Sequence, residues 1–232
     1  MEEILRAGLS ALGLTTDAVP ALLDFSRRLL EKNQVMNLTA ITAPGDVARL
    51  HLLDCAALCS HYDLRGKTGV DVGTGAGFPG MVLRLLEPEY RLTLLDSLGK
   101  RVDWLAETCG EMGLGDVDCV HARAEEFAQE QREQFDVATS RAVAQLNVLC
   151  ELALPLIKVG GVFLAMKSVD SDEELDAARG AIGQLGGKVE EVWEYTIPTT
   201  DVKHRIIAIR KVRPTPAQFP RAFAKIKKSP LK

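Results

Sequence analysis

The sequence predicts an α/β fold, in which a mostly parallel, seven-stranded sheet is covered by helices on both faces and follows an N-terminal helical extension. From residue 68 onward, short apolar runs alternate with helical stretches, which is typical of strands joined by crossover helices. The runs are apolar along nearly their whole length, as in parallel strands that are buried on both faces. A glycine-rich turn at residues 73–80 follows the first run and precedes a helical stretch, which is typical of a nucleotide pocket at the edge of such a sheet.

Residues 1–60 are predicted to form the helical extension. Apolar residues recur there at the spacing of one helix face, and Gly13 offers a stop for the first helix. Either Thr16 or Asp17 is expected to cap the second helix. The expected helices cover residues 2–12, 17–32 and 46–58, with a polar, turn-like segment at 33–42.

Residues 61–212 are predicted to form the sheet domain. The expected strands are 68–72, 91–95, 117–121, 135–139, 161–166, 188–196 and 204–210. The expected helices between them are 79–87, 98–112, 123–131, 144–157 and 172–184. The connection between the last two strands is too short for a crossover, so these two strands should be antiparallel.

The composition is that of a soluble protein with one good core, since 47% of the residues are hydrophobic. No run approaches the roughly 18 apolar residues of a membrane span, and the start Met1-Glu2-Glu3 lacks the basic residues of a signal peptide. We therefore expect a cytoplasmic protein that does not contact a membrane. The five cysteines form no C-x-x-C pair and have no partners at zinc spacing, which predicts reduced thiols and no metal site.

The charge of the chain is unevenly distributed. The net charge is −4, yet residues 202–232 contain ten Lys and Arg residues and no Asp or Glu. A basic segment on an acidic body indicates a polyanionic partner, and nucleic acid is the partner that this pattern favours. The alternative is a solvated, partly disordered C-terminus without a partner. We assign residues 213–232 to a basic C-terminal tail.

The glycine-rich turn fits two nucleotide patterns. Residues 75–80 satisfy the dinucleotide pattern G-x-G-x-x-G, whereas residues 73–77, with Asp71 two positions earlier, satisfy the S-adenosylmethionine pattern G-x-G-x-G. In a dinucleotide turn the first glycine follows the strand directly; here that glycine is Gly73, and the residue five positions further on is Phe78. The register therefore favours the methyl donor. An ordinary α/β turn remains the structural alternative.

Candidate ligand contacts follow from the position of the strand ends, because ligands of open α/β sheets bind outside the carboxyl ends of the strands. Asp96 ends the second apolar run, where a carboxylate can accept hydrogen bonds from both ribose hydroxyls. Arg141 follows the fourth strand and is expected beside donor and acceptor, although a surface arginine is an equally good interpretation of its position. The candidate donor-binding residues are Gly73, Gly75, Gly77, Phe78, Asp96, Ala124, Glu125 and Arg141.

Missing motifs restrict the acceptor. No Asn-Pro-Pro-Tyr-like segment follows the fourth strand, which disfavours methylation of an exocyclic amine, and no Pro-Cys pair is present for an adduct at pyrimidine C5. Guanine N7 carries a free lone pair, so alignment and a suitable electrostatic environment suffice for its methylation. None of the four histidines is then needed as a base, and each is interpreted as structural.

Several motifs together resemble one protein family. They are Met36 to Ala40, His51-Leu52-Leu53-Asp54, Val70 to Gly80, Leu94 to Ser97 with Lys100-Arg101, Arg123 to Glu126, Phe135-Asp136, Ser140-Arg141-Ala142 and Pro155 to Gly161. In these motifs the chain resembles the bacterial small-subunit ribosomal RNA methyltransferase G family, also called glucose-inhibited division protein B. The resemblance extends over nearly the whole sequence.

The resemblance implies a class I, Rossmann-like methyltransferase that transfers a methyl group from S-adenosylmethionine to N7 of a guanosine in 16S rRNA. It implies that Gly73 and Phe78 contact the donor, that Ala124 and Glu125 flank the adenine, and that Arg141 is catalytic, near the target base. The expected partner is 16S rRNA or the 30S subunit, and we expect a monomer. Alternative hypotheses are a methyltransferase for small molecules or proteins, a nicotinamide-dependent oxidoreductase, and an RNA-binding protein without activity.

The RNA-facing residues are expected among the basic side chains, as phosphate contacts. They are Lys100, Arg101, Lys167, Arg221, Lys225, Lys227 and Lys228. The chain also departs from the family pattern. Arg49 is one residue further from His51 than is usual, Cys55 replaces a usual Ser, and Ala224 and Ile226 stand where related tails often have Gly and Pro.

Overall fold

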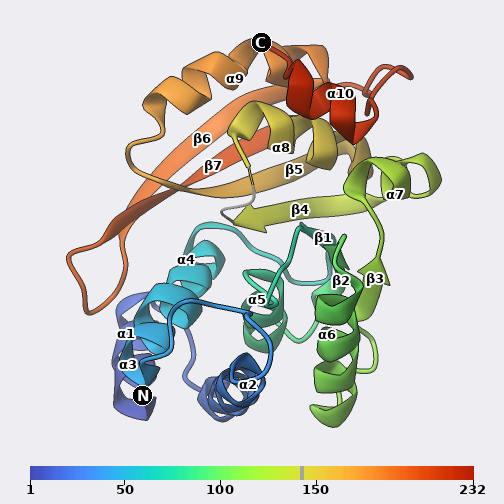
Figure 1. The fold of residues 1–232 in the computed structure, drawn as a ribbon. Coiled ribbons are helices and arrows are strands. Elements are labelled where there is room, and N and C mark those ends of the chain that lie inside the picture. The colour runs from blue at the N-terminus through green and yellow to red at the C-terminus, as the bar shows by residue number, and fades with distance from the viewer. Residues whose placement is uncertain (142–143) are drawn as a thin grey trace.

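A computed structural model describes residues 1–141 and 144–232 of the chain, and it has the predicted α/β architecture (Figure 1). The seven strands lie in the order β3-β2-β1-β4-β5-β7-β6. Strands β1 to β5 run parallel to one another, and β7 runs antiparallel to both β5 and β6. The strands are β1 (Thr68–Val72), β2 (Arg91–Asp96), β3 (Asp118–His121), β4 (Phe135–Arg141), β5 (Ile157–Ser168), β6 (Gly187–Thr196) and β7 (Lys203–Lys211).

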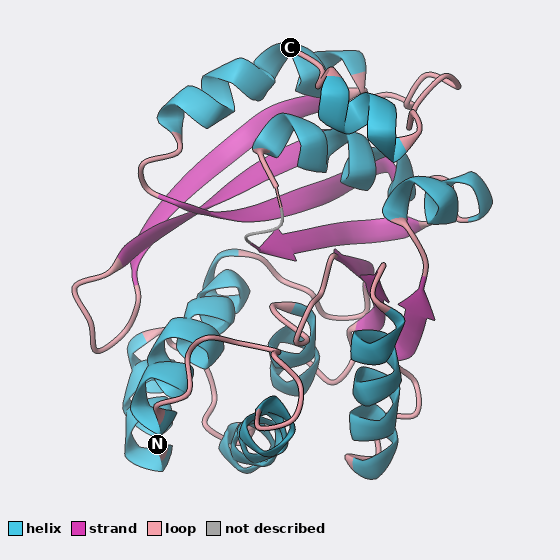
Figure 2. Cartoon of the chain, in the orientation of Figure 1, coloured by secondary structure: helices cyan, strands magenta, loops and turns pink. Residues whose placement is uncertain are grey.

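Helices cover both faces of the sheet (Figure 2). On one side lie α4 (Asp54–His61), α5 (Gly80–Leu86) and α6 (Gly99–Glu111), together with the N-terminal helices α1 (Glu2–Ala11) and α2 (Val19–Asn33). On the other side lie α7 (Ala124–Glu130), α8 (Leu146–Ala153), α9 (Asp172–Gln184) and α10 (Phe223–Lys228). The chain therefore begins in one layer and ends in the other. No helix of the described ranges is both long and apolar enough to span a bilayer.

Two hydrophobic clusters fill the spaces between the sheet and these layers. Leu94 and Leu95 are neighbours on β2 and belong to opposite clusters, because successive side chains of a strand point to opposite faces. Leu5 and Phe25 of the N-terminal helices are buried in the same cluster as Leu94. The helical extension thus shares a core with the sheet, and the division of the chain at residues 60 and 212 remains a prediction.

The expected helix at 46–58 contains an unusual turn. A short α3 (Pro44–Asp46) continues into the π-helix η1 (Val47–Leu53), which then continues into α4. Residues of a π-helix are spaced more widely around the axis than those of an α-helix, and such turns are frequent at functional sites. His51 lies in this turn and Asp54 begins the α-helix that follows.

The structure corrects three local expectations. Neither Thr16 nor Asp17 caps α2, because the residue before that helix is Ala18 and no side chain caps it. The helix expected at 144–157 ends at Ala153 and a 3-10 turn, η2 (Leu154–Leu156), follows, since a proline at 155 is incompatible with a continued α-helix. The fifth strand begins at residue 157 and passes through Gly160, whose positive φ of 91° belongs to an irregular pairing with β4 rather than to a turn.

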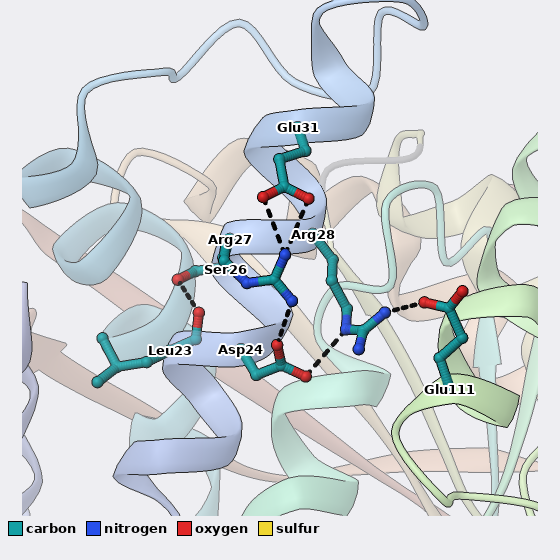
Figure 3. A network of polar contacts seen from close by, with 7 residues as sticks. All are labelled: Leu23, Asp24, Ser26, Arg27, Arg28, Glu31 and Glu111. Atoms are coloured by element: carbon teal, nitrogen blue, oxygen red, sulfur yellow. Dashed lines mark hydrogen bonds and ion pairs between the residues drawn. The ribbon is translucent and has the colours of Figure 1, made fainter.

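Charged side chains join the helical extension to the sheet domain (Figure 3). Asp24 of α2 accepts hydrogen bonds from Arg27 at 2.6 Å and from Arg28 at 2.9 Å, and the hydrogen bond from Arg28 is the main cause of the lowered pKa of Asp24. Arg28 also donates to Glu111 at the end of α6. Exposed pairs of this kind each contribute about 0–1 kcal/mol, so they orient α2 more than they stabilise the fold.

The C-terminal tail is packed against the second layer. Ile226 of α10 is fully buried in the cluster formed by α8 and the sheet. Arg221 donates to both carboxylate oxygens of Glu151, at 2.7 and 2.6 Å, and Glu151 is itself fully buried in α8. The alternative of a solvated tail is therefore wrong for this segment, while Lys225, Lys227 and Lys228 remain exposed on α10.

Candidate functional site

One cavity of about 940 Å³ opens at the carboxyl ends of β1, β2 and β4. It has the position that the sequence predicts for a ligand, and its size lies near the upper end of the roughly 300–1,000 Å³ that is common for ligand sites. All of the candidate donor-binding residues except one line it. The lining residues among them are Gly73, Gly75, Phe78, Asp96, Ala124, Glu125 and Arg141.

The second and third glycines of the G-x-G-x-G turn serve different purposes. Gly75 has a φ of +60°, and a Cβ atom placed on it would meet only open space, with its nearest neighbours 3.9 Å away. Gly77 does not line the cavity; a Cβ atom there would lie 2.8 Å from Cγ of Met81 and 3.1 Å from Phe25. Gly75 therefore keeps the cavity open, whereas Gly77 allows the turn to pack on the helices beneath it.

Asp71 lies beneath the turn and does not line the cavity. Its carboxylate accepts hydrogen bonds from the backbone N–H of Gly80 at 2.9 Å and from the hydroxyl of Thr139 at 2.9 Å. The side chain is fully buried, and burial raises its pKa. Asp71 thus joins β1, the start of α5 and β4, and it supports the turn rather than a ligand.

Asp96 holds the other side of the turn. Its Oδ2 accepts from the backbone N–H of Gly75 at 2.8 Å and its Oδ1 accepts from that of Leu98 at 2.9 Å. An ionised carboxylate has about four acceptor positions, so about two remain for further donors. Because Asp96 also lines the cavity, these positions fit the two hydroxyls of a ribose.

The opposite end of the cavity is formed by Phe78, Arg141 and His51. The guanidinium carbon of Arg141 lies 5.0 Å from the centre of the Phe78 ring, and the His51 ring stacks on Phe78 at 4.6 Å. Arg141 donates from Nη1 to the carbonyl of Leu50 at 3.0 Å and to Oδ2 of Asp54 at 2.9 Å. Its second terminal nitrogen, Nη2, lies 2.9 Å from Nδ1 of His51. These contacts fix the guanidinium in one orientation.

Asp54 is the centre of a buried polar network at this end. Besides Arg141, its carboxylate is bonded by Nδ1 of His204 at 2.8 Å and by the hydroxyl of Tyr195 at 2.8 Å. Burial opposes ionisation, but the hydrogen bond from His204 and the charge of Arg141 together hold the pKa of Asp54 below its usual range. The same hydrogen bond raises the pKa of His204. The network joins α4, β4, β6 and β7.

His51 is neutral in this arrangement. Its Nδ1 faces a guanidinium, which can only donate, so Nδ1 must carry a lone pair and the proton must lie on Nε2. That proton is directed to the Thr39 hydroxyl at 2.8 Å. Burial and the charge of Arg141 lower the pKa of His51 to about 4, in agreement with a neutral ring.

Interpreting the histidines as structural overlooked His51 and His204, which line the cavity together with Asp54. These three residues come from η1, β7 and α4, so no single spacing connects all of them. Two signals were available for His51 and Asp54: their spacing of three positions, because residues three apart share a helix face, and their occurrence in one motif of the family resemblance. Among the described residues no cluster of His, Cys, Asp and Glu suited to a metal ion occurs.

The expected RNA-contacting residues are not all equally available. Arg101 lines the cavity and Lys100 is exposed beside it. Lys167 is largely buried and its ammonium contacts the Ala144 carbonyl and Glu174, both at 2.6 Å. Arg221 is held by Glu151. Lys100, Arg101 and the three lysines of α10 are therefore better placed for phosphate contacts than Lys167 and Arg221.

Comparison with known proteins identifies the family. The family model described as rRNA small subunit methyltransferase G matches residues 18–204. The chain belongs to the rRNA small subunit methyltransferase G family. It is 47% identical to the ribosomal RNA small subunit methyltransferase G of Alkaliphilus metalliredigens, over 99% of this chain and 98% of that one. It is 46% identical to the protein of the same name from Alkaliphilus oremlandii, over 100% of this chain and 99% of that one. The family prediction is confirmed.

Solved structures confirm the fold of this methyltransferase G family member. An S-adenosylmethionine-dependent O-methyltransferase from Thermotoga maritima matches 81% of this chain and 73% of its own, with a TM-score of 0.55 and 16% identity. TYW2 of M. jannaschii, crystallised in complex with AdoMet, matches 64% of this chain and 70% of its own, with a TM-score of 0.53 and 13% identity. The sheet order and the antiparallel β7 are those of class I methyltransferases.

Proposed function

We propose that this chain methylates N7 of a guanosine in 16S rRNA, with S-adenosylmethionine as the methyl donor. Membership of the family makes the chain an S-adenosylmethionine-dependent rRNA methyltransferase, as the sequence predicted. The roles proposed for individual residues rest on one observation. Asp96, with free acceptor positions, lies at one end of the cavity, and the immobilised Arg141 lies at the other end. When bound, S-adenosylmethionine supplies a methyl group that the lone pair of guanine N7 can take without a base.

The donor fits the cavity in one orientation, with its ribose at Asp96 and its methionine end toward Arg141. The free acceptor positions of Asp96 suit the ribose, and the open space at Gly75 leaves room for the backbone of the turn to approach it. Ala124 and Glu125, at the start of α7, would border the adenine. Because β4 lies on the other side of β1 from β2, the methionine end then lies toward Arg141. Gly73 and Phe78 border the space between these two ends.

The chain's own residues would act by alignment and electrostatics. Arg141 is kept in place by Asp54, His51 and the Leu50 carbonyl, so its position costs no further ordering when the substrates bind. The Phe78 ring and the neighbouring apolar residues give the methionine end an apolar wall. We propose Arg141 as the catalytic residue that holds this end, with no proton transferred to or from it.

The rRNA would reach the cavity over a surface that includes Lys100, Arg101 and the lysines of α10, Lys225, Lys227 and Lys228. We propose that the enzyme acts as a cytoplasmic monomer on 16S rRNA or on the 30S subunit. Support comes from the family and from the basic segment, which has no acidic residue between Val202 and the last residue of the sequence.

Transfer of labelled methyl from S-adenosylmethionine tests the proposal. Deproteinised 16S rRNA, intact 30S subunits and a reaction without RNA are compared, with wild type and Arg141→Ala in parallel. We expect label in RNA only, and a decrease of about 100-fold in turnover for Arg141→Ala while its affinity for rRNA changes less than about threefold. Label in a protein, or none in any RNA while the donor still binds, would favour a protein or small-molecule acceptor instead.

A further inference from the structure

We infer that His204 recognises O6 of the acceptor guanine by donating a hydrogen bond from Nε2, and that Asp54 is the residue that positions it. This inference rests on the proposed function and adds the group that distinguishes guanine from adenine. His204 is the second residue of β7 and lines the cavity. Its side chain is about one-third exposed, so the ring is available to a ligand.

His204 lies at the acceptor end of the cavity. It shares the Asp54 carboxylate with Arg141, since the two side chains bond opposite oxygens at 2.8 and 2.9 Å. Its neighbour Val202 also lines the cavity and is 41% exposed, which leaves an apolar surface beside the ring for a base to contact. The fixed end of the ring is Nδ1, so Nε2 is the nitrogen left for the acceptor.

The other strong donors at this end have other uses. Three of the five N–H groups of the Arg141 guanidinium are bonded to Leu50, Asp54 and His51, and the remaining two, on Nη2 and Nε, belong to the methionine end in the proposed function. The one ring proton of His51 is directed to Thr39. The Thr39 hydroxyl accepts from His51 and from the N–H of Ile41 and retains its own proton, so Thr39 is the competing candidate.

The hydrogen bond to Asp54 decides which proton His204 carries. A carboxylate only accepts, so Nδ1 must bear a proton, and a proton on Nε2 then requires the imidazolium form. The imidazolium is paired with the negative charge of Asp54, so it presents an N–H group without an isolated positive charge near the methyl group. The reaction needs no proton transfer to or from His204, because N7 methylation releases none.

This donor has a specific use in the recognition of guanine. On the edge of the base that carries N7, guanine presents O6, an acceptor, whereas adenine presents an amino group, a donor. A site with a fixed N–H therefore bonds guanine and repels adenine. Sites that hydrogen-bond a substrate group discriminate strongly against analogues that lack it, because the donor of the site is then left unpaired.

The assignment predicts the direction of the pH dependence. The groups around His204 are the Asp54 carboxylate of α4, Arg141 of β4 and the Tyr195 ring of β6, whose centre lies 6.4 Å from that of His204. The hydrogen bond to Asp54 raises the pKa of His204, so the imidazolium persists at higher pH than in a free histidine. Turnover should be constant at low pH and fall as the pH rises through this raised pKa. A general base would give the opposite slope.

The experiment compares two RNAs that differ in O6 and in the proton that guanine carries on N1. One carries guanosine at the target position, and the other carries 2-aminopurine ribonucleoside, which keeps N7 and lacks O6. Initial rates of methyl transfer at limiting RNA are measured for wild type, His204→Ala, His204→Gln, Thr39→Val and, as a histidine control outside this cavity, His61→Ala. We expect wild type and His61→Ala to prefer guanosine by about 10- to 100-fold.

For His204→Ala this preference should fall toward one, while the affinity for S-adenosylmethionine stays unchanged. His204→Gln should recover part of the preference and lose the fall in rate at high pH, because an amide donor does not titrate. Any of three results would overturn the inference. The preference for guanosine could be unchanged in His204→Ala, it could be lost in Thr39→Val alone, or the rate could rise with pH. If wild type methylates no rRNA guanosine, the proposed function itself fails, and the two failures are thereby distinguished.

Discussion

Gly75 shows at the scale of single residues how the backbone shapes the donor site. Its φ of +60° is unfavourable for any other residue, and a side chain there would point into the cavity rather than into a neighbour. Asp96 accepts from the N–H of Gly75, so the same carboxylate that we assign to the ribose also fixes the turn. The donor site is therefore a property of the backbone and of one carboxylate.

Gly75→Val should abolish binding of S-adenosylmethionine. The branched side chain occupies the space that the donor requires, and its strained backbone costs about 1–2 kcal/mol. We expect the dissociation constant, measured by calorimetry, to rise at least about 100-fold while the circular dichroism spectrum is retained. Gly110→Ala on α6 is the matched control, since nothing lies within 4 Å of its added Cβ. If Gly75→Val binds the donor as strongly as this control does, the pocket assignment is refuted.

His51 makes the stability of the protein depend on pH. Its pKa is lowered to about 4 by burial and by Arg141, so between that value and its ordinary value of 6.5 the unfolded chain binds more protons than the folded one. The stability that the neutral His51 confers is present above pH 6.5 and is lost as the pH falls toward 4. Over this range it amounts to at most about 3 kcal/mol.

The His51→Gln variant should show a correspondingly smaller loss of stability than wild type between pH 6.5 and 4. Urea unfolding at several pH values measures this difference, and His121→Gln, at an exposed position, is the control. Parallel pH profiles for wild type and His51→Gln would show that His51 is not the group responsible.

At the scale of elements, an ion pair with a buried carboxylate helps to attach the tail to α8. Glu151 is fully buried, and its partner Arg221 is also largely shielded from solvent. Breaking a buried pair by removing one partner is costly, because the remaining charge is left uncompensated. Arg221 is therefore explained by stability, without a contact to RNA.

Arg221→Met should lower the free energy of unfolding by about 3–5 kcal/mol, as measured by urea denaturation. The double variant Arg221→Met with Glu151→Leu should recover most of this loss, because it removes both charges. If instead the single variant is as stable as wild type and loses affinity for rRNA, Arg221 belongs to the RNA-binding surface.

The elements were predictable where local patterns determine them. The strand at residues 68–72 and the helix at 172–184 have the predicted bounds, since apolar periodicity and flanking polar residues coincide there. The fifth strand was predicted too short, because Gly160 and Gly161 resemble a turn until the pairing with β4 is known. The π-helix has no sequence signal of its own, and the ordered tail depends on a buried glutamate far away in the sequence.

The same distinction applies to the site. Gly75, Asp96 and Arg141 lie at or just beyond the ends of strands that a sequence pattern can identify, so their position in one cavity could be predicted. The network of Asp54 with His51 and His204 depends on tertiary contacts between segments up to 150 residues apart. Sequence reasoning places residues at strand ends, but it does not pair side chains across the sheet.

At the scale of the whole molecule, the charge is segregated between an acidic body and a basic end of the sequence. Folding brings part of that end back to the cavity, because Phe223 of α10 lines it and Arg123 lies 5.2 Å from the Phe223 ring. The exposed lysines of α10 therefore lie close to the donor site. This arrangement suits an enzyme that must hold a long polyanion while it modifies one base.

Replacing Lys225, Lys227 and Lys228 together by Gln should reduce the salt dependence of rRNA binding. Each lost phosphate contact lowers the slope of log K against log salt by about 0.7 for single-stranded RNA, so a change of about 2 is expected if all three make contacts. The slope is measured by filter binding at salt concentrations between about 50 and 300 mM. The control is Arg91→Gln, because Arg91 is exposed at the start of β2, at the end of the strand away from the cavity. This variant should leave the slope unchanged. Equal slopes for the triple variant and wild type would exclude α10 from the RNA surface.

The most direct test of the central claim is to locate the product atom. 16S rRNA methylated by the purified protein is cleaved chemically at 7-methylguanosine, and the fragments are mapped by primer extension. We predict cleavage at a single guanosine, present with wild type and strongly reduced with Arg141→Ala. Methyl label in the RNA without such cleavage would place the methyl group on another atom and would contradict the assignment of guanine N7.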